Sequence, residues 1–248
     1  NAREGRTGAF FSMEMTKVQL AQRRIARTSG ISVKLQNGTL DDTQYHKVSM
    51  AVQELRRMNL PLFIDQRPKL TLSQIRATAR RLHRKHGLQY IVIDYLQIMG
   101  DDASVMNAQR TYQIGHNTAG LKALAKELDI PIILLAQVSR GVEKAEDKRP
   151  GMSDLKDSGA IEQDADIIMF VYREAYYLER NPPVQSDREN YTDFADRQTA
   201  HDLLLREKKG VATIIVAKAR QGEAPVNVDI AFDGERVTFG NLRRPRES

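Results

Sequence analysis

The sequence contains no cysteine, and this absence excludes several kinds of site. Without a thiol there is no disulfide framework, no cysteine nucleophile and no cysteine-ligated metal, a composition that suits a reducing cytoplasm. Long apolar runs are also absent, because the longest, at residues 130–138, is far shorter than the roughly 20 residues of a membrane helix. No basic and apolar signal pattern opens the chain, and no internal repeat is present. We therefore expect no membrane association and no secretion.

The composition is that of a soluble globular protein. The chain has 248 residues, of which 41% are hydrophobic and 28% charged, so it is able to bury a proper core. This length fits a single α/β domain. Its 38 basic residues against 32 acidic ones give a net charge of +6, which mildly favours a polyanionic partner.

Short apolar runs alternate with helical patterns along the chain. This alternation is typical of an α/β fold in which a mostly parallel twisted sheet has helices on both faces. Helices are expected to begin at the N-caps Thr16 and Thr71 and to end at Gly30 and Gly87. A turn at residues 233–234 predicts antiparallel strands at the C-terminal end. The expected strands lie at residues 8–12, 61–64, 89–93, 131–136, 167–172, 212–217, 226–232 and 236–239.

Three charged regions are expected at the surface. The helix that begins after Thr71 has a basic face around Arg80 opposite its apolar face, and we interpret this basic face as solvated. Residues 139–151 are expected to form a charged loop. Residues 174–209 lack a clear hydrophobic period, which predicts an inserted surface excursion.

Polar side chains follow three of the expected strands. Glu14 comes after the first strand, Asp94 after the third and Gln137 after the fourth. Ligands of parallel α/β sheets bind beyond the carboxyl ends of the strands, so these side chains converge if their strands are neighbours. In such a site an aspartate holds Mg²⁺, a glutamate aligns the attacking water and a glutamine senses the γ-phosphate. The alternatives are a strand-end turn for Asp94, a helix-start carboxylate for Glu14 and a structural role for Gln137.

Six motifs in a fixed order make the sequence similar to one family. It resembles the ATPase domain of the bacterial replicative DNA helicase, DnaB type, over nearly its whole length. The matching motifs are Phe10–Met15, Tyr90–Leu96, Leu121–Leu128, Ala136–Arg140, Asp154–Asp166 and Lys218–Gly222. The resemblance implies a RecA-like fold and a homohexamer that encircles single-stranded DNA and unwinds duplex at the replication fork, driven by ATP hydrolysis. It also implies primase and a helicase loader as partners, and a cytoplasmic, nucleoid-associated location.

The resemblance assigns roles at the nucleotide site. It makes Glu14 the catalytic base or water-orienting group, Asp94 the carboxylate that holds Mg²⁺, and Gln137 the γ-phosphate sensor. It places Arg23, nine residues after Glu14 on the same helix, beside the bound ATP. The alternative for Arg23 is an ordinary surface arginine.

A second pair of cations is assigned to the neighbouring subunit. The resemblance implies that Lys218 and Arg220 reach across a subunit boundary to the neighbour's phosphates. A cation supplied in trans stabilises charge on the transferred phosphoryl group and links hydrolysis to the state of the interface. Without the resemblance, these two residues are interpreted as charges on an edge strand.

The resemblance further implies a DNA-binding loop. Lys156, Asp157 and Gly159, together with Arg140, lie where the family contacts the DNA backbone. A glycine lets the main chain approach a phosphate closely, without reading bases. The alternative is a helix N-cap at 153–154 followed by one turn. The Lys156-Asp157 pair departs from the commoner Arg-Glu, which keeps the charges but loses the guanidinium fork.

The family's phosphate-binding loop, Gly-x-x-x-x-Gly-Lys-[Ser/Thr], is absent from these residues. By the resemblance it lies roughly a dozen residues before Asn1, together with the first core strand. We therefore expect 1–248 to be a single RecA-like domain, truncated at its N-terminus, that follows a primase-binding domain. Alone, these residues are expected not to hydrolyse ATP, because the amides and lysine that hold the phosphates are missing.

Three functions from different classes are compatible with these motifs. The first is the motor of a hexameric replicative helicase. The second is a non-catalytic fragment for oligomerisation and interaction, and the third is a RecA-like recombinase that forms filaments. The motif at Asp154–Asp166 favours the helicase over the recombinase.

Overall fold

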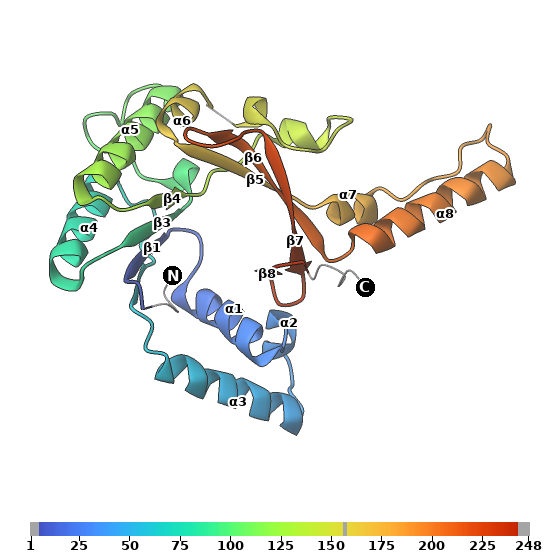
Figure 1. Cartoon of the computed structure of the whole chain (residues 1–248), viewed down its shortest axis with the longest axis horizontal. Helices are drawn as coiled ribbons and strands as arrows, with labels where there is room; N and C mark the ends of the chain where they lie inside the picture. The colour runs from blue at the N-terminus through green and yellow to red at the C-terminus, as the bar shows by residue number, and fades with distance from the viewer. Residues whose placement is uncertain (1–4, 156–157, 243–248) are drawn as a thin grey trace. The chain divides into compact units, whose positions relative to one another are not determined.

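The computed structural model describes residues 5–155 and 158–242, which form two compact units (Figure 1). The first unit contains the residues up to Gly141 together with Met152–Ala165, and the second contains Val142–Gly151 and the residues from Asp166 onward. The expected single domain thus consists of two compact units, and its status as one domain stays a prediction.

A parallel sheet is the centre of the first unit. Its four strands are β1 (Gly8–Ser12), β2 (Leu62–Asp65), β3 (Tyr90–Asp94) and β4 (Ile132–Leu134). They lie in the order β2-β1-β3-β4, and all neighbouring pairs are parallel. The central strands supply fully buried side chains, among them Phe11, Ile91 and Ile93. A continuous apolar run is what a strand with both faces covered needs, and the sequence of β3 has one.

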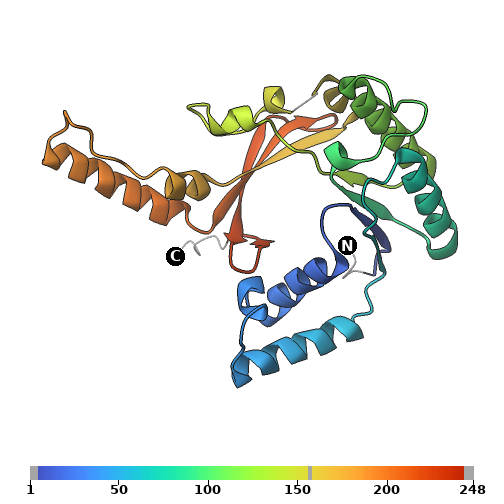
Figure 2. The same cartoon turned by 180° about the vertical axis from the view of Figure 1, so that it is seen from behind.

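Helices flank this sheet. The helices are α1 (Lys17–Ser29), α2 (Val33–Gln36), α3 (Asp42–Arg57), α4 (Leu72–His86), α5 (Arg110–Leu128) and α6 (Ser158–Asp164). Short 3-10 turns are η2 (Leu96–Ile98), η3 (Arg140–Glu143) and η4 (Met152–Asp154). Helices α4 and α5 lie on one side of the sheet and α1 on the other, as Figure 1 and the reverse view in Figure 2 show. Helix α5 packs against both α4 and α6.

The predicted helix boundaries are confirmed by their capping groups. The hydroxyls of Thr16 and Thr71 accept hydrogen bonds from the backbone three residues later, and each belongs to a complete capping box. Gly30 and Gly87 end these helices in the left-handed conformation that glycine adopts without steric penalty. These local signals position α1 directly after Glu14 and the strand-end loop that holds it.

The second unit is built on an antiparallel sheet. Its strands are β5 (Ile167–Tyr172), β6 (Val211–Ala219), β7 (Val226–Asp233) and β8 (Thr238–Gly240), in that order across the sheet. The antiparallel strands predicted at the C-terminal end are therefore present, and in the described residues they form a sheet of their own. Together with the helix-covered parallel sheet, they confirm the predicted α/β fold class.

The segment 174–209 contains two helices that the sequence did not predict. Helix α7 (Glu174–Arg180) follows β5 directly, and α8 (Tyr191–Lys208) begins at Asn190, whose side chain accepts a hydrogen bond from the backbone of Asp193. No side chain of α8 is buried, so the helix lacks the apolar stripe that reveals a helix in a sequence. Its origin as an insertion stays a prediction. Among the described residues, no helix has the length and apolar character needed to cross a membrane.

Candidate functional site

The three strands that precede Glu14, Asp94 and Gln137 are neighbours in the sheet, which meets the condition under which these residues converge. Ser12 lies opposite Asp94 in the parallel pair β1–β3, and the backbone N–H of Met13 donates to the carbonyl of Asp94 at 3.1 Å. Strand β4 lies on the other side of β3. The structure therefore places all three residues beyond the carboxyl ends of neighbouring strands, where parallel sheets bind ligands, and the carboxylate of Glu14 lies near that of Asp94.

A tight turn between β1 and α1 exposes Glu14. The hydroxyl of Ser12, which is only 1% exposed, donates to the carbonyl of Met15 at 2.8 Å. The capping box at Thr16 then starts α1 within two residues of Glu14. Glu14 itself is exposed at the tip of this turn, so its carboxylate is accessible to a ligand beyond the strand end.

Asp94 lies in an electrostatically unfavourable place for a carboxylate. Partial burial raises the pKa of Asp94, and the neighbouring carboxylate of Glu14 raises it further, while Arg23 acts in the opposite direction. This effect indicates that Arg23 of α1 lies near Asp94. A bound cation would relieve the repulsion between them.

Asp94 is suited to Mg²⁺ only when other ligands of the ion come from a nucleotide and water. No group of three or more His, Cys, Asp or Glu residues within the described ranges is arranged to hold a metal ion. Mg²⁺ usually keeps several waters and binds through one or two carboxylates together with substrate phosphates. Asp94 therefore fits an ion that arrives with a nucleotide, and not a resident metal held by protein alone.

Sequence reasoning missed Gln97, which contacts Gln137 directly. Gln97 lies in η2, between the buried residues Leu96 and Met99. Its side chain accepts a hydrogen bond from the backbone N–H of Gln137 at 3.0 Å. The one signal in the sequence was a glutamine within an apolar stretch three residues after Asp94.

Arg140 lies beside the expected DNA loop within the first unit. The N–H of Ser139 donates to the carbonyl of Asp154 at 2.7 Å, and Val138 forms an antiparallel bridge with Leu155. These contacts hold the chain after Gln137 next to the segment that leads into α6. Arg140 is exposed there. Lys156 and Asp157, the central residues of the predicted loop, lie outside the described residues.

Gly159 is an exposed residue of α6, with open space where a side chain would project. The helix itself is fixed to α5, because the hydroxyl of Thr118 donates to the carboxylate of Asp164 at 2.6 Å and Ile161 is buried. A main chain that is accessible and firmly supported suits a contact with a phosphate backbone.

Lys218 and Arg220 belong to the second unit, at the end of β6 and just after it. The backbone N–H of Arg220 donates to the carbonyl of Asp166 at 2.8 Å, and its guanidinium forms an ion pair with the Asp166 carboxylate at 3.3 Å. Both side chains of this pair are about half exposed, so the pair is weak. A phosphate with higher charge would compete well with Asp166 for Arg220.

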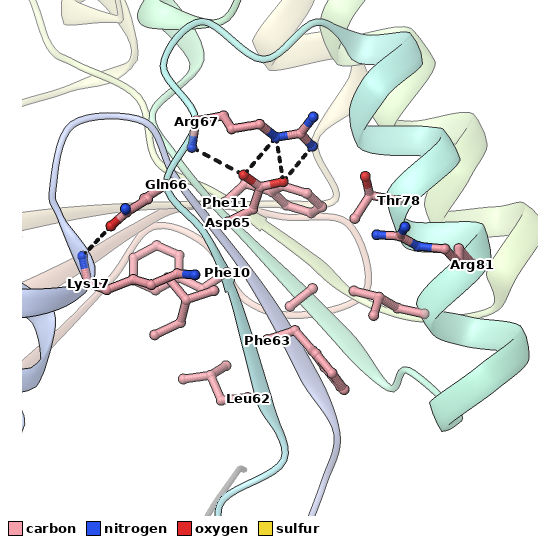
Figure 3. Close-up of a pocket in the computed structure, with 13 residues that line it drawn as sticks. Phe10, Phe11, Lys17, Leu62, Phe63, Asp65, Gln66, Arg67, Thr78 and Arg81 are labelled. Carbon is pink, nitrogen blue, oxygen red and sulfur yellow. Dashed lines mark hydrogen bonds and ion pairs between the residues drawn. The ribbon is translucent and has the colours of Figure 1, made fainter.

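A cavity of about 590 Å³ lies at the β2 edge of the parallel sheet (Figure 3). Strands β1 and β2 and helix α4 line it, with Phe10 and Phe63 among the lining residues. Two nitrogens of the Arg67 guanidinium donate hydrogen bonds to the carboxylate of Asp65, and these bonds hold the pKa of Asp65 below its usual value. None of the predicted site residues lines this cavity, so it is distinct from the strand-end cluster of Glu14, Asp94 and Gln137.

The chain is similar to helicase domains over nearly all of its length. The sequence profile of the DnaB-like helicase C terminal domain matches residues 1–241. The replicative DNA helicase DnaB of Rickettsia bellii is 43% identical over 94% of this chain, which corresponds to 45% of that protein. The DnaB of Geobacillus stearothermophilus is 41% identical over 95% of this chain and 46% of its own. The chain thus spans less than half the length of these curated relatives.

Solved structures extend the similarity to the fold. A DnaB-like replicative helicase, studied with its interactions with primase, superposes with a TM-score of 0.80 and 32% identity, over 98% of this chain and 52% of its own. A second solved structure, itself an ATPase domain, superposes with a TM-score of 0.78 and 31% identity, over 98% of this chain and 76% of its own. The predicted RecA-like form of the α/β fold agrees with both neighbours.

Proposed function

Because the chain belongs to the DnaB-like helicase C-terminal domain family, we propose that it is the motor part of an ATP-driven replicative DNA helicase. In this proposal, six subunits encircle single-stranded DNA, translocate along it and unwind duplex at the replication fork. The observation that carries the proposal is that Glu14, Asp94 and Gln137 follow three neighbouring parallel strands at the same edge of the sheet.

Each residue of the cluster has a role that its environment supports. The exposed carboxylate of Glu14 orients the attacking water and accepts its proton. Asp94 holds the water shell of Mg²⁺, and Arg23 contributes positive charge beside the phosphates. Gln137 donates to the γ-phosphate and so distinguishes ATP from ADP. When bound with ATP, Mg²⁺ neutralises the charge that develops on the transferred phosphoryl group.

The remaining predicted residues serve DNA and the neighbouring subunit. Arg140, Lys156 and the main chain at Asp157 and Gly159 contact the phosphate backbone of single-stranded DNA. Arg220, with Lys218, leaves Asp166 and reaches the ATP of the adjacent subunit. A solved relative was studied with primase, which supports primase as a partner. We propose a helicase loader as a second partner, and a cytoplasmic, nucleoid-associated location.

The test of this function is Glu14→Gln in the full-length protein. We expect nucleotide binding to persist while DNA-stimulated ATP hydrolysis falls by about 10² to 10⁴, because the amide neither accepts the proton nor carries charge. The matched control is Glu179→Gln, at an exposed position of α7, which is expected to hydrolyse ATP normally. Turnover by Glu14→Gln close to that of the control would show that Glu14 is only a helix-start residue.

Particle shape separates the helicase from the recombinase. Electron microscopy of the full-length protein with ATP is expected to show closed rings, since a subunit contact that closes gives a ring. Open filaments would favour strand exchange over unwinding.

A further inference from the structure

The side chain of Gln97 uses both of its polar atoms on the main chain of a single residue. Its Oε1 accepts from the N–H of Gln137 at 3.0 Å, and its Nε2 donates to the carbonyl of Gln137 at 3.3 Å. Strand β4 ends at Leu134, so Gln137 lies beyond the ladder that fixes the sheet. Gln97 thus supplies at Gln137 the two hydrogen bonds that a neighbouring strand supplies within a sheet.

The backbone around Gln97 is itself held by hydrogen bonds on either side of its Cα. The N–H of the preceding residue, the fully buried Leu96, donates to the carbonyl of Leu135 at 2.9 Å. Arg110, at the start of α5, donates from Nη2 to the carbonyl of Gln97 at 2.6 Å. Charge-assisted hydrogen bonds of this length are among the stronger ones in proteins, so the backbone of Gln97 is well fixed.

Arg110 is braced in turn against the loop between η2 and α5. Its Nη1 donates to Oε1 of Gln113 at 3.2 Å, and an ion pair at 3.8 Å links it to Asp101. Gln113 is only 7% exposed, and its Nε2 donates to the carbonyls of Val105 and Met106, each at 3.2 Å. A continuous chain of hydrogen bonds therefore connects the loop at 101–109 with Gln137.

We infer that Gln97 is a positioning residue that sets the place of Gln137, and that Arg110 fixes Gln97 for this task. The inference rests on the proposed role of Gln137 at the γ-phosphate. A residue that reads one phosphate must be held to within a fraction of an ångström, and a misplacement of about 1 Å is able to reduce a rate by about a hundredfold. Gln137 is exposed and lies beyond the strand, so its own packing does not hold it.

Two substitutions of Gln97 separate its donor from its acceptor. Gln97→Leu removes both hydrogen bonds, whereas Gln97→Glu keeps the acceptor for the N–H of Gln137 and loses the donor. The matched control is Gln89→Leu, because the side chain of Gln89 accepts from the N–H of Thr7 at 3.1 Å, before β1 and away from the strand ends. All three variants are made in the full-length protein.

The first measurement is hydrogen exchange of peptides that contain Gln137, followed by mass spectrometry. Its amide is expected to exchange roughly tenfold faster in Gln97→Leu, and at the original rate in Gln97→Glu and Gln89→Leu. If the exchange rate of the Gln137 amide is unchanged in Gln97→Leu, the inference is overturned, regardless of the rate at which this variant hydrolyses ATP.

The second measurement is steady-state ATP hydrolysis with DNA. In Gln97→Leu, kcat is expected to fall about 10- to 100-fold while the Kd for nucleotide changes less than about twofold, and Gln97→Glu is expected to recover part of kcat. A loss of affinity with unchanged kcat would overturn the positioning role. Arg110→Lys, which loses the guanidinium fork, is expected to lower kcat in the same way.

Gln137→Ala distinguishes failure of the inference from failure of the proposed function. If Gln137→Ala hydrolyses ATP normally, the sensor role of Gln137 is wrong, and the hydrogen exchange of Gln137 alone decides whether Gln97 positions its backbone. If Gln137→Ala is inactive while Gln97→Leu is fully active, only the positioning role is wrong.

Discussion

At the scale of single residues, the site combines accessible charge with local instability. Asp94 carries a pKa raised by burial and by Glu14, so at neutral pH its ionised form works against folding. A bound cation would compensate the unfavourable negative charge of this carboxylate. Functional sites commonly hold residues that lower the stability of the unliganded protein.

Asp94→Asn tests this balance. A folded-state pKa above the unfolded one gives stability that is present at low pH and lost as the pH rises through the folded value. The neutral amide avoids that loss, so the unfolding midpoint without nucleotide is expected to rise by about 1–3 °C at neutral pH. Mg²⁺-dependent nucleotide binding is expected to fall sharply. Calorimetry of unfolding with and without Mg²⁺-nucleotide measures the midpoint and its increase on nucleotide binding. A midpoint lowered by Asp94→Asn in the absence of nucleotide would contradict the destabilising effect of the Asp94 charge.

The sequence predicted these residues unevenly. We could identify Glu14, Asp94 and Gln137 because each follows an apolar strand. Ligands of parallel sheets bind beyond the carboxyl ends of the strands, which makes residues at these positions candidates for the site. Gln97 was not identifiable, because its contact with Gln137 joins residues 40 positions apart. Nothing in the local pattern states where a glutamine side chain points.

At the scale of elements, the start of α4 is tied to the loop after β3. Asp102 lies in this loop, and its carboxylate accepts from the N–H of Ser73 in the first turn of α4. Burial acts to raise the pKa of Asp102, but hydrogen bonds from Thr71 and Ser73, with His116 Nε2 3.6 Å from the carboxylate, outweigh it, so the pKa lies below its usual value. An anion at a helix N-terminus is favoured by the helix dipole as well.

Asp102→Asn is therefore expected to lower the free energy of unfolding by about 1 kcal/mol at pH 7. Because the folded pKa is depressed, this stability is present above the unfolded pKa and is lost as the pH falls through the folded value. The free energies of unfolding of Asp102→Asn and of the unsubstituted protein, measured with denaturant, should therefore become more similar below about pH 4. Asp187→Asn, in an exposed loop, is the control. A difference that stays constant with pH would show that the charge of Asp102 is not the cause.

The elements themselves were predicted well where caps and apolar faces are strong. The strands at 8–12 and 167–172 have the predicted bounds, and α4 has the predicted apolar face, on which it buries Leu72, Ile75 and Ala79. Helix α8 was missed because it buries no side chain and so shows no amphipathic period, and α7 was missed because its seven residues are too few to show one. The separation of the antiparallel strands into a second sheet depends on pairing between distant segments, which no local pattern encodes.

At the scale of the whole molecule, DNA binding is expected to depend on salt and not on sequence. Contacts with the phosphate backbone release counterions, so the logarithm of affinity should fall linearly with the logarithm of salt concentration. Arg140→Ala should reduce the magnitude of that slope by about 0.7 for single-stranded DNA, and Lys156→Ala by a similar amount. Arg197→Ala, whose arginine pairs with Glu189, should leave the slope unchanged. Fluorescence anisotropy across salt concentrations checks this, and slopes identical in all variants would contradict the DNA loop.

The central claim is that the strand-end cluster hydrolyses ATP with help from Arg220 of a neighbouring subunit. It is tested most directly by mixing two inactive variants of the full-length protein, Arg220→Ala and Glu14→Gln. In a random equal mixture, about one interface in four joins an intact Glu14 site to an intact Arg220. DNA-stimulated ATP hydrolysis is therefore expected to return in the mixture, since each such interface holds every group that the transition state needs. Mixed rings that demonstrably form and yet stay as inactive as either parent would contradict the account.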